Sequence, residues 1–166
     1  MRSPLVGLVL KTAFIFASTG TAAAVGISEV EQAFASNGPK YVISRYFDCE
    51  TGEGYRLVAS GEPRAIRFAV RLLKHSDTCV SELLHSSLGE AMIVAPETVL
   101  PYVNTDQRLT ANDICLTFLS ADDPPATLRP IVARARSSLL RVTSPELVPQ
   151  RNACLEQVES LPANLK

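Results

Sequence analysis

The sequence predicts an all-α protein, a compact orthogonal bundle of roughly seven to nine short helices stapled by two disulfides. Glycine and proline divide the chain after residue 24 into short pieces, and most pieces space their apolar residues at helical intervals. Alternation typical of strands is almost absent. The cysteines are even in number: Cys49, Cys79, Cys115 and Cys154. Consecutive helix pairs also allow HEAT-like packing, although no fixed repeat period is found.

Residues 1–24 have the composition of an export signal. A basic start is followed by a mostly apolar stretch, and small residues end the segment at Ala22 and Ala24. Lys11 interrupts the apolar stretch, whereas a membrane anchor needs about 20 uninterrupted apolar residues. We therefore expect a signal peptide over 1–24, a single helical domain over 25–166, and a periplasmic or secreted protein without a transmembrane segment after cleavage.

The mature chain carries little net charge. The leader holds two of the 16 Lys and Arg side chains, which leaves 14 against 17 Asp and Glu, a formal charge of −3. Nucleic-acid-binding domains are normally basic, so the composition argues against a nucleic-acid partner. A domain of about 140 residues can bury enough apolar surface to form a core without a metal. The oligomeric state stays open.

Two short helices are expected at the start of the domain. Ser28 and Glu31 have the spacing of a capping box, and Gly38 ends the helix that they begin. Pro39 is suited to the first position of a second helix, which reaches Cys49. A strand over Tyr41 to Phe47 is the alternative.

The next two helices are separated by Gly61, which can adopt the left-handed conformation that closes a helix. Thr51 is the expected N-cap of the first of them. Pro63 begins the second, which runs to Lys74 and has the clearest amphipathic pattern of the chain. Its apolar stripe consists of Ile66, Ala69, Val70 and Leu73.

Three helices are expected in the middle of the chain. Asp77 is the N-cap of a helix over 77–91, and Pro96 begins a brief one over 96–103. A polar loop separates these from a short element over 110–119.

Two longer helices are expected at the end of the chain. The first covers 124–142, where Pro130 is a candidate kink. The second begins at Ser144 and covers 144–161.

Of the three possible cysteine pairings, the sequential one, Cys49–Cys79 and Cys115–Cys154, is favoured. Cys49 and Cys79 flank the 63–74 helix, and the other two lie on apolar helix faces. Each closed loop is worth about 3.5 to 4 kcal/mol. No C-x-x-C spacing is present, so we expect a structural role without redox chemistry, and the wide spacing disfavours zinc.

Common catalytic motifs do not occur: the sequence lacks G-x-S-x-G, H-E-x-x-H and a glycine-rich phosphate loop. His75 and His85 are the two histidines, and with Glu82 they could hold a metal. The plainer interpretation of Glu82 and His85 is a surface hydrogen bond. We assign no catalytic residue, metal or cofactor.

Two basic helix faces are candidate binding surfaces for an anionic partner. The first consists of Arg64, Arg67, Arg71 and Lys74, and the second of Arg129, Arg134, Arg136 and Arg141. Solvated helix faces give the same pattern without a binding role. Aromatic side chains, which often anchor interfaces, cluster at Tyr41, Tyr46, Phe47 and Tyr55.

The helix starts and stops of residues 38–115 resemble those of a group of exported bacterial helical proteins of unassigned function. The resemblance rests on Gly61 to Ile66, on the Ser76-Asp77 helix start, on Leu88 to Ala91 and on Pro96 to Leu100. It implies an all-helical, cystine-containing periplasmic domain, and it carries no catalytic residue across.

The sequence therefore predicts an exported, non-enzymatic helical protein that binds another protein or an anionic envelope component, as an inhibitor or toxin-immunity protein would. One alternative is a metal-dependent or hydrolytic envelope enzyme that uses His75, Glu82 and His85. The other is an envelope structural or assembly factor with a permanent partner.

Overall fold

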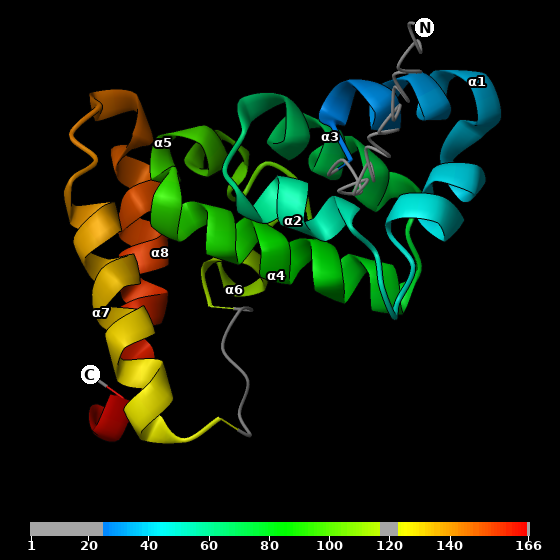
Figure 1. The fold of residues 1–166 in the computed structure, drawn as a ribbon. Helices are drawn as coiled ribbons and strands as arrows, with labels where there is room; N and C mark the ends of the chain where they lie inside the picture. The colour runs from blue at the N-terminus through cyan, green and yellow to red at the C-terminus, as the bar shows by residue number, and fades with distance from the viewer. Residues whose placement is uncertain (1–24, 117–122, 166) are drawn as a thin grey trace, which may run out of the picture.

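Helices account for all the regular structure in the part of the chain that a computed structural model describes, residues 25–116 and 123–165. Eight α-helices and four short 3₁₀-helices follow one another in these two ranges (Figure 1). The all-α prediction is confirmed. The expected leader over 1–24 and residues 117–119 of the expected 110–119 element lie outside the described residues.

Helix α1 (Ile27–Tyr46) contains a break at the predicted place. Gly38 has φ 80° and ψ 177°, and Pro39 resumes the helix directly after it. An L side chain rarely adopts this φ, which explains the glycine. The alternative of a strand after Pro39 is wrong, because the segment is helical as far as Tyr46.

The predicted capping box at the start of α1 is wrong. The helix begins one residue before Ser28, with Gly26 at the N-cap and no side-chain cap. Ser28 and Glu31 therefore lie inside the first turns, where their side chains are available to another helix.

Helix α2 (Gly54–Ala59) begins later than expected. Its N-cap is Glu53, and the Thr51 hydroxyl contacts the Asp48 carboxylate instead, so the predicted Thr51 cap is wrong. Gly61 closes the segment with φ 77°, as predicted. A Cβ at Gly61 would lie 2.6 Å from the Ala95 Cβ, so the tight packing also requires glycine.

Helix α4 (Thr78–Val94) is the centre of the bundle. Asp77 caps it as predicted, with its Oδ1 3.0 Å from the Val80 amide. Four helices pack on α4: α2, α5 (Pro96–Val99), α6 (Ala111–Cys115) and α7 (Pro125–Leu140) (Figure 1). In a solenoid each helix pair contacts only its neighbours, so this arrangement is a bundle and not a HEAT-like stack.

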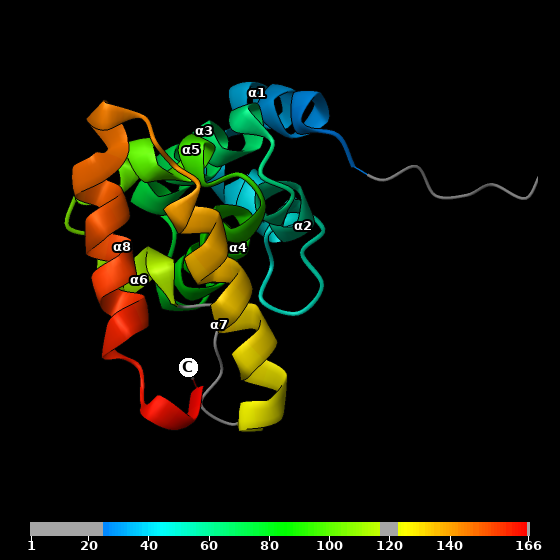
Figure 2. The ribbon, with the colours of Figure 1, turned by 90° about the vertical axis from the view of Figure 1, so that its left-hand side faces the viewer.

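Helices α7 (Pro125–Leu140) and α8 (Val148–Ser160) form an antiparallel pair that crosses the direction of α4 (Figures 1 and 2). Pro130 lies in the second turn of α7, and the helix continues through it although the hydrogen bond to the carbonyl four residues earlier is lost. A 3₁₀ turn, η3 (Pro145–Leu147), leads into α8 close to the predicted start.

The core surrounds α4 and joins side chains from nearly every helix. Its largest members are at most 1% exposed; they include Phe47, Phe68, Leu72, Leu84, Leu88, Met92, Ile114 and Leu139. Both predicted disulfides are present, Cys49–Cys79 and Cys115–Cys154, and all four cysteines are thereby used. Across residues 25–116 and 123–165, each helix is too short or too polar to cross a bilayer.

Candidate functional site

The first predicted binding face lies on α3 (Pro63–Leu72) and on the 3₁₀ turn η1 (Leu73–His75) that extends it. Glu62 caps α3, because its carboxylate accepts the amides of the second and third helical residues. Ile66, Ala69 and Leu73 of the apolar stripe are buried and Val70 is half-buried. The four predicted basic residues are all exposed: Arg64, Arg67, Arg71 and Lys74.

Arg64 of α3 binds side chains of α1. Its guanidinium forms an ion pair with Glu31 and donates a hydrogen bond to the Ser28 hydroxyl at 3.3 Å. Ser28 and Glu31, which the sequence suggested as a cap, therefore serve as a tertiary contact. Arg64 is occupied and is not a free element of the predicted face.

Arg71 is likewise engaged within the molecule. Its guanidinium lies 4.7 Å from the centre of the Phe34 ring and 5.1 Å from that of Phe68. The two rings meet edge to face at 5.4 Å, which brings α1 against α3. A cation over an aromatic face is attracted by the ring quadrupole, so Arg71 covers and stabilises this seam.

Arg67 and Lys74 are the two remaining cations of the face. Among the residues that the structure describes, neither forms a hydrogen bond, an ion pair or a cation–π contact. They are separated by about two helical turns and lie on the same side of the α3–η1 segment. Both charges are therefore available to an external anion.

A cleft of about 170 Å³ lies beside Lys74. One wall comes from α3 and η1 and the other from the loop before α6, and its lining consists of Val70, Leu73, Lys74, Thr105, Asp106, Arg108 and Leu109. Arg67 lies one turn before Val70 on α3 and is not itself part of the lining. We call Arg67, Lys74 and this depression the cationic cleft.

The loop wall of the cationic cleft is held by Arg108. Its guanidinium donates to the Leu73 carbonyl at the C-terminal end of α3 at 2.6 Å, and its own carbonyl lies 2.6 Å from the His85 ring nitrogen. Asp106 accepts the Arg108 amide at 3.0 Å. The sequence predicts only a polar loop here, because the contact between Leu73 and Arg108 leaves no local signal.

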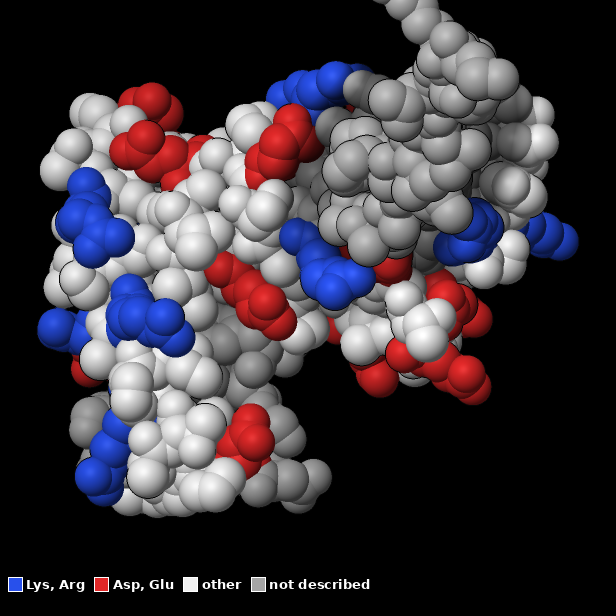
Figure 3. Space-filling model, viewed as in Figure 1, with Lys and Arg blue, Asp and Glu red and all other residues white. Residues whose placement is uncertain are grey.

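The second predicted basic face, on α7, is mostly engaged in packing. Arg136 pairs with Glu159 of α8 at 2.8 Å, and Arg129 donates to the Asn164 carbonyl at 2.7 Å. Lys and Arg gather along the left-hand edge of Figure 3, over α7 and α8, and alternate with Asp and Glu elsewhere on that face. These arginines therefore join α7 to the C-terminal segment.

The residues of the alternative metal site have other contacts. His85 bonds the Arg108 carbonyl, and the His75 ring lies 6.0 Å from the Phe34 ring. The described ranges hold no group of three His, Cys, Asp or Glu side chains placed to bind a metal ion. The geometry thus gives His75, Glu82 and His85 no common site.

Most of the aromatic cluster on α1 and α2 belongs to the interior. Burial, followed by a 3.0 Å hydrogen bond to Glu29, raises the pKa of Tyr46. Burial also raises the pKa of Tyr55, whose hydroxyl donates to the Phe47 carbonyl at 2.7 Å. Tyr41, 44% exposed, is the member that faces solvent.

Comparison of the chain with known protein families, with curated proteins and with solved structures finds no match. The cationic cleft is therefore interpreted from its own geometry and charge.

Proposed function

We propose that the protein is an exported, non-enzymatic binding protein that recognises an acidic segment of another protein at the cationic cleft. The observation that carries the proposal is that Lys74, which has no partner among the described residues, lines a depression whose apolar residues are Val70, Leu73 and Leu109. Arg67, equally without a partner among the described residues, lies two turns earlier on the same side of the helix. A partner segment with a carboxylate next to an apolar side chain fits this combination.

Export and an oxidising compartment are part of the proposal. The leader-like residues 1–24 support it, and so does the use of all four cysteines in disulfides. An inhibitor or immunity protein acts by occupying its target, which requires a rigid surface and no catalytic group. A bundle reinforced by two disulfides supplies such a surface.

Charge reversal at the two free cations tests the proposal. The Arg67→Glu/Lys74→Glu variant should lose a partner that the wild type recovers from an envelope extract of the native host, while its thermal unfolding stays unchanged. Arg134→Glu is the matched control, because Arg134 is exposed on α7 and away from the cleft. Equal recovery by the double variant would exclude the cationic cleft as the binding site.

The chemistry of the partner is tested by cross-linking from inside the cleft. Thr105 lines the cleft and is exposed, so a photoreactive amino acid at this position should label whatever occupies it. The proposal expects labelled peptides rich in Asp and Glu. Labelling of anionic phospholipid in vesicles, with no labelled protein, would replace the protein partner by an envelope lipid.

High salt distinguishes a reversible electrostatic contact with the partner from a permanent assembly. Because solvent-exposed charges carry the proposed interaction, raising the ionic strength to about 1 M should release the partner. Recovery unaffected by salt would favour the structural or assembly factor.

A further inference from the structure

The two disulfides differ in access. Cys49 is exposed and Cys79 is half-buried, whereas Cys115 and Cys154 are 1% and 0% exposed. A thiol in solution must contact a sulfur to exchange with it. In the folded protein the residues of the Cys49–Cys79 bond are therefore the more accessible of the two pairs.

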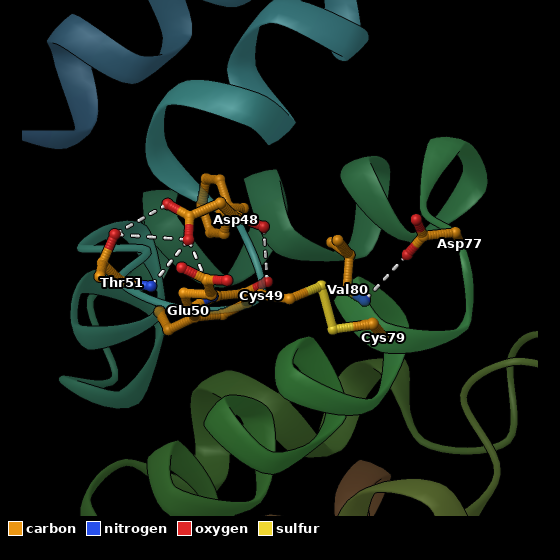
Figure 4. The surroundings of a disulfide bond; sticks show 9 residues. Asp48, Cys49, Glu50, Thr51, Asp77, Cys79 and Val80 are labelled. Carbon is orange, nitrogen blue, oxygen red and sulfur yellow. Dashed lines mark hydrogen bonds between the residues drawn. A yellow bond between two sulfur atoms is a disulfide. The ribbon is translucent and has the colours of Figure 1, made fainter.

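The loop that carries Cys49 is held without the disulfide. The Asp48 carboxylate accepts the Glu50 amide at 2.8 Å and the Thr51 amide at 2.7 Å (Figure 4). The preceding residue, Phe47, is 1% exposed and its carbonyl accepts the Tyr55 hydroxyl. The hydrogen bonds that hold the loop at Cys49 therefore do not involve the disulfide.

The surroundings of this disulfide are acidic. Asp48 and Glu50 flank Cys49, and Asp77 lies two residues before Cys79 (Figure 4). Arg45 lines the same depression as Asp48, together with Glu29 and Glu53, so carboxylates outnumber cations there. The local field therefore attracts a positively charged reagent and repels a negatively charged one.

We propose that Cys49–Cys79 is a thiol–disulfide exchange site whose preferred co-reactant is a thiol that carries a positive charge. The site is separate from the cationic cleft and does not depend on the proposed binding function. It assigns reversible chemistry to one disulfide and a permanent structural role to the other.

The exchange proceeds in two balanced steps. The incoming thiolate attacks the Cys49 sulfur, the bond between the two cysteine sulfurs breaks, and Cys79 leaves as a thiolate that takes a proton from water. Cys79 lies in the first turn of α4, where the positive end of the helix dipole favours the departing negative charge. A second thiolate then attacks the sulfur of the bound thiol and releases Cys49, so two electrons pass from two thiols to the protein.

Three small thiols of different charge test the proposal on the folded full-length protein, without denaturant. Cysteamine is cationic, 2-mercaptoethanol is neutral and 2-mercaptoethanesulfonate is anionic. At equal thiolate concentration and low ionic strength, alkylation and peptide mapping should show adducts on Cys49, a free Cys79 and an intact Cys115–Cys154. Cysteamine should react on the order of tenfold faster than the sulfonate, and high salt should remove the difference.

Reaction of Cys115–Cys154 at a comparable rate would overturn the proposal, and so would equal rates for the three thiols at low salt. Glu50→Gln removes one flanking charge, and only the backbone amide of Glu50 takes part in the loop hydrogen bonds. In this variant the rates of cysteamine and of the sulfonate should differ less than in the wild type. Glu146→Gln is the matched control, because Glu146 is an exposed carboxylate of η3, and it should leave the rate differences between the thiols unchanged. Unchanged rate differences in Glu50→Gln would also contradict the proposal.

Discussion

The N-terminal region, α1 to α3 with the loop at Cys49, and the C-terminal pair α7–α8 are each tied to the centre of the bundle by one disulfide, but in different surroundings. Cys49–Cys79 fastens a loop at the surface, and Cys115–Cys154 joins α6 to α8 inside the core. The cysteine separations are 30 and 39 residues, so chain entropy stabilises both by similar amounts, about 3.5 to 4 kcal/mol. Any difference between the two disulfides in their contribution to stability therefore comes from burial.

Removal of the buried disulfide should have the largest effect. The Cys115→Ala/Cys154→Ala variant loses the loop constraint and the packing of two buried sulfurs, so we expect a loss of about 5 to 6 kcal/mol in the free energy of unfolding. Urea unfolding followed by circular dichroism measures it. If this variant loses less free energy of unfolding than the variant without the surface disulfide, burial does not explain the difference between the two disulfides.

Removal of the surface disulfide is the matched comparison. The Cys49→Ala/Cys79→Ala variant should lose about 3.5 kcal/mol, because the loop constraint disappears while the core keeps its packing. Hydrogen exchange of the 48–53 loop should change little, since the Asp48 and Tyr55 hydrogen bonds remain. Collapse of the whole fold would show that the loop depends on its disulfide.

The contact of α1 with α3 is expected to contribute less than either disulfide. Arg71→Met keeps an unbranched apolar stem over Phe34 and Phe68 and removes the charge, which should cost about 1 kcal/mol. Arg67→Met removes the same charge from the same helix, and Arg67 has no ion pair or cation–π contact with the residues that the structure describes, so the melting temperature of this variant should match that of the wild type. Equal destabilisation by the two variants would contradict the conclusion that Arg71 has a structural role and Arg67 has none.

The smallest expected effect is the pH dependence of the stability that Asp48 contributes in the loop at Cys49. The amides of Thr51 and Glu50 lower the pKa of Asp48 below its ordinary 3.8. A carboxylate with a lowered pKa contributes stability above pH 3.8, and this contribution disappears as the pH falls through the lowered value. The melting temperatures of wild type and Asp48→Asn should therefore converge in acid, and a constant difference across the acid range would argue against a role for the ionised form.

Part of the candidate site could be predicted from the sequence. The stripe of Arg64, Arg67, Arg71 and Lys74 follows from helical spacing alone, and the structure places all four on the exposed side of one segment. The sequence could not divide them into two bound and two free cations. That division depends on Ser28, Glu31 and Phe34, more than 30 residues away, which reach α3 only through the packing of α1.

The sequence by itself determined the helices, the breaks at Gly38 and Gly61, and the pairing of the cysteines, because each depends on local periodicity, backbone freedom or a choice among few pairings. Tertiary structure alone decided which of the exposed cations are bound by side chains of α1. It also formed the cationic cleft, since Arg108 meets the end of α3 across 35 residues of chain. Such contacts join segments whose separation in the sequence leaves no periodic trace, and only the folded backbone brings them within reach.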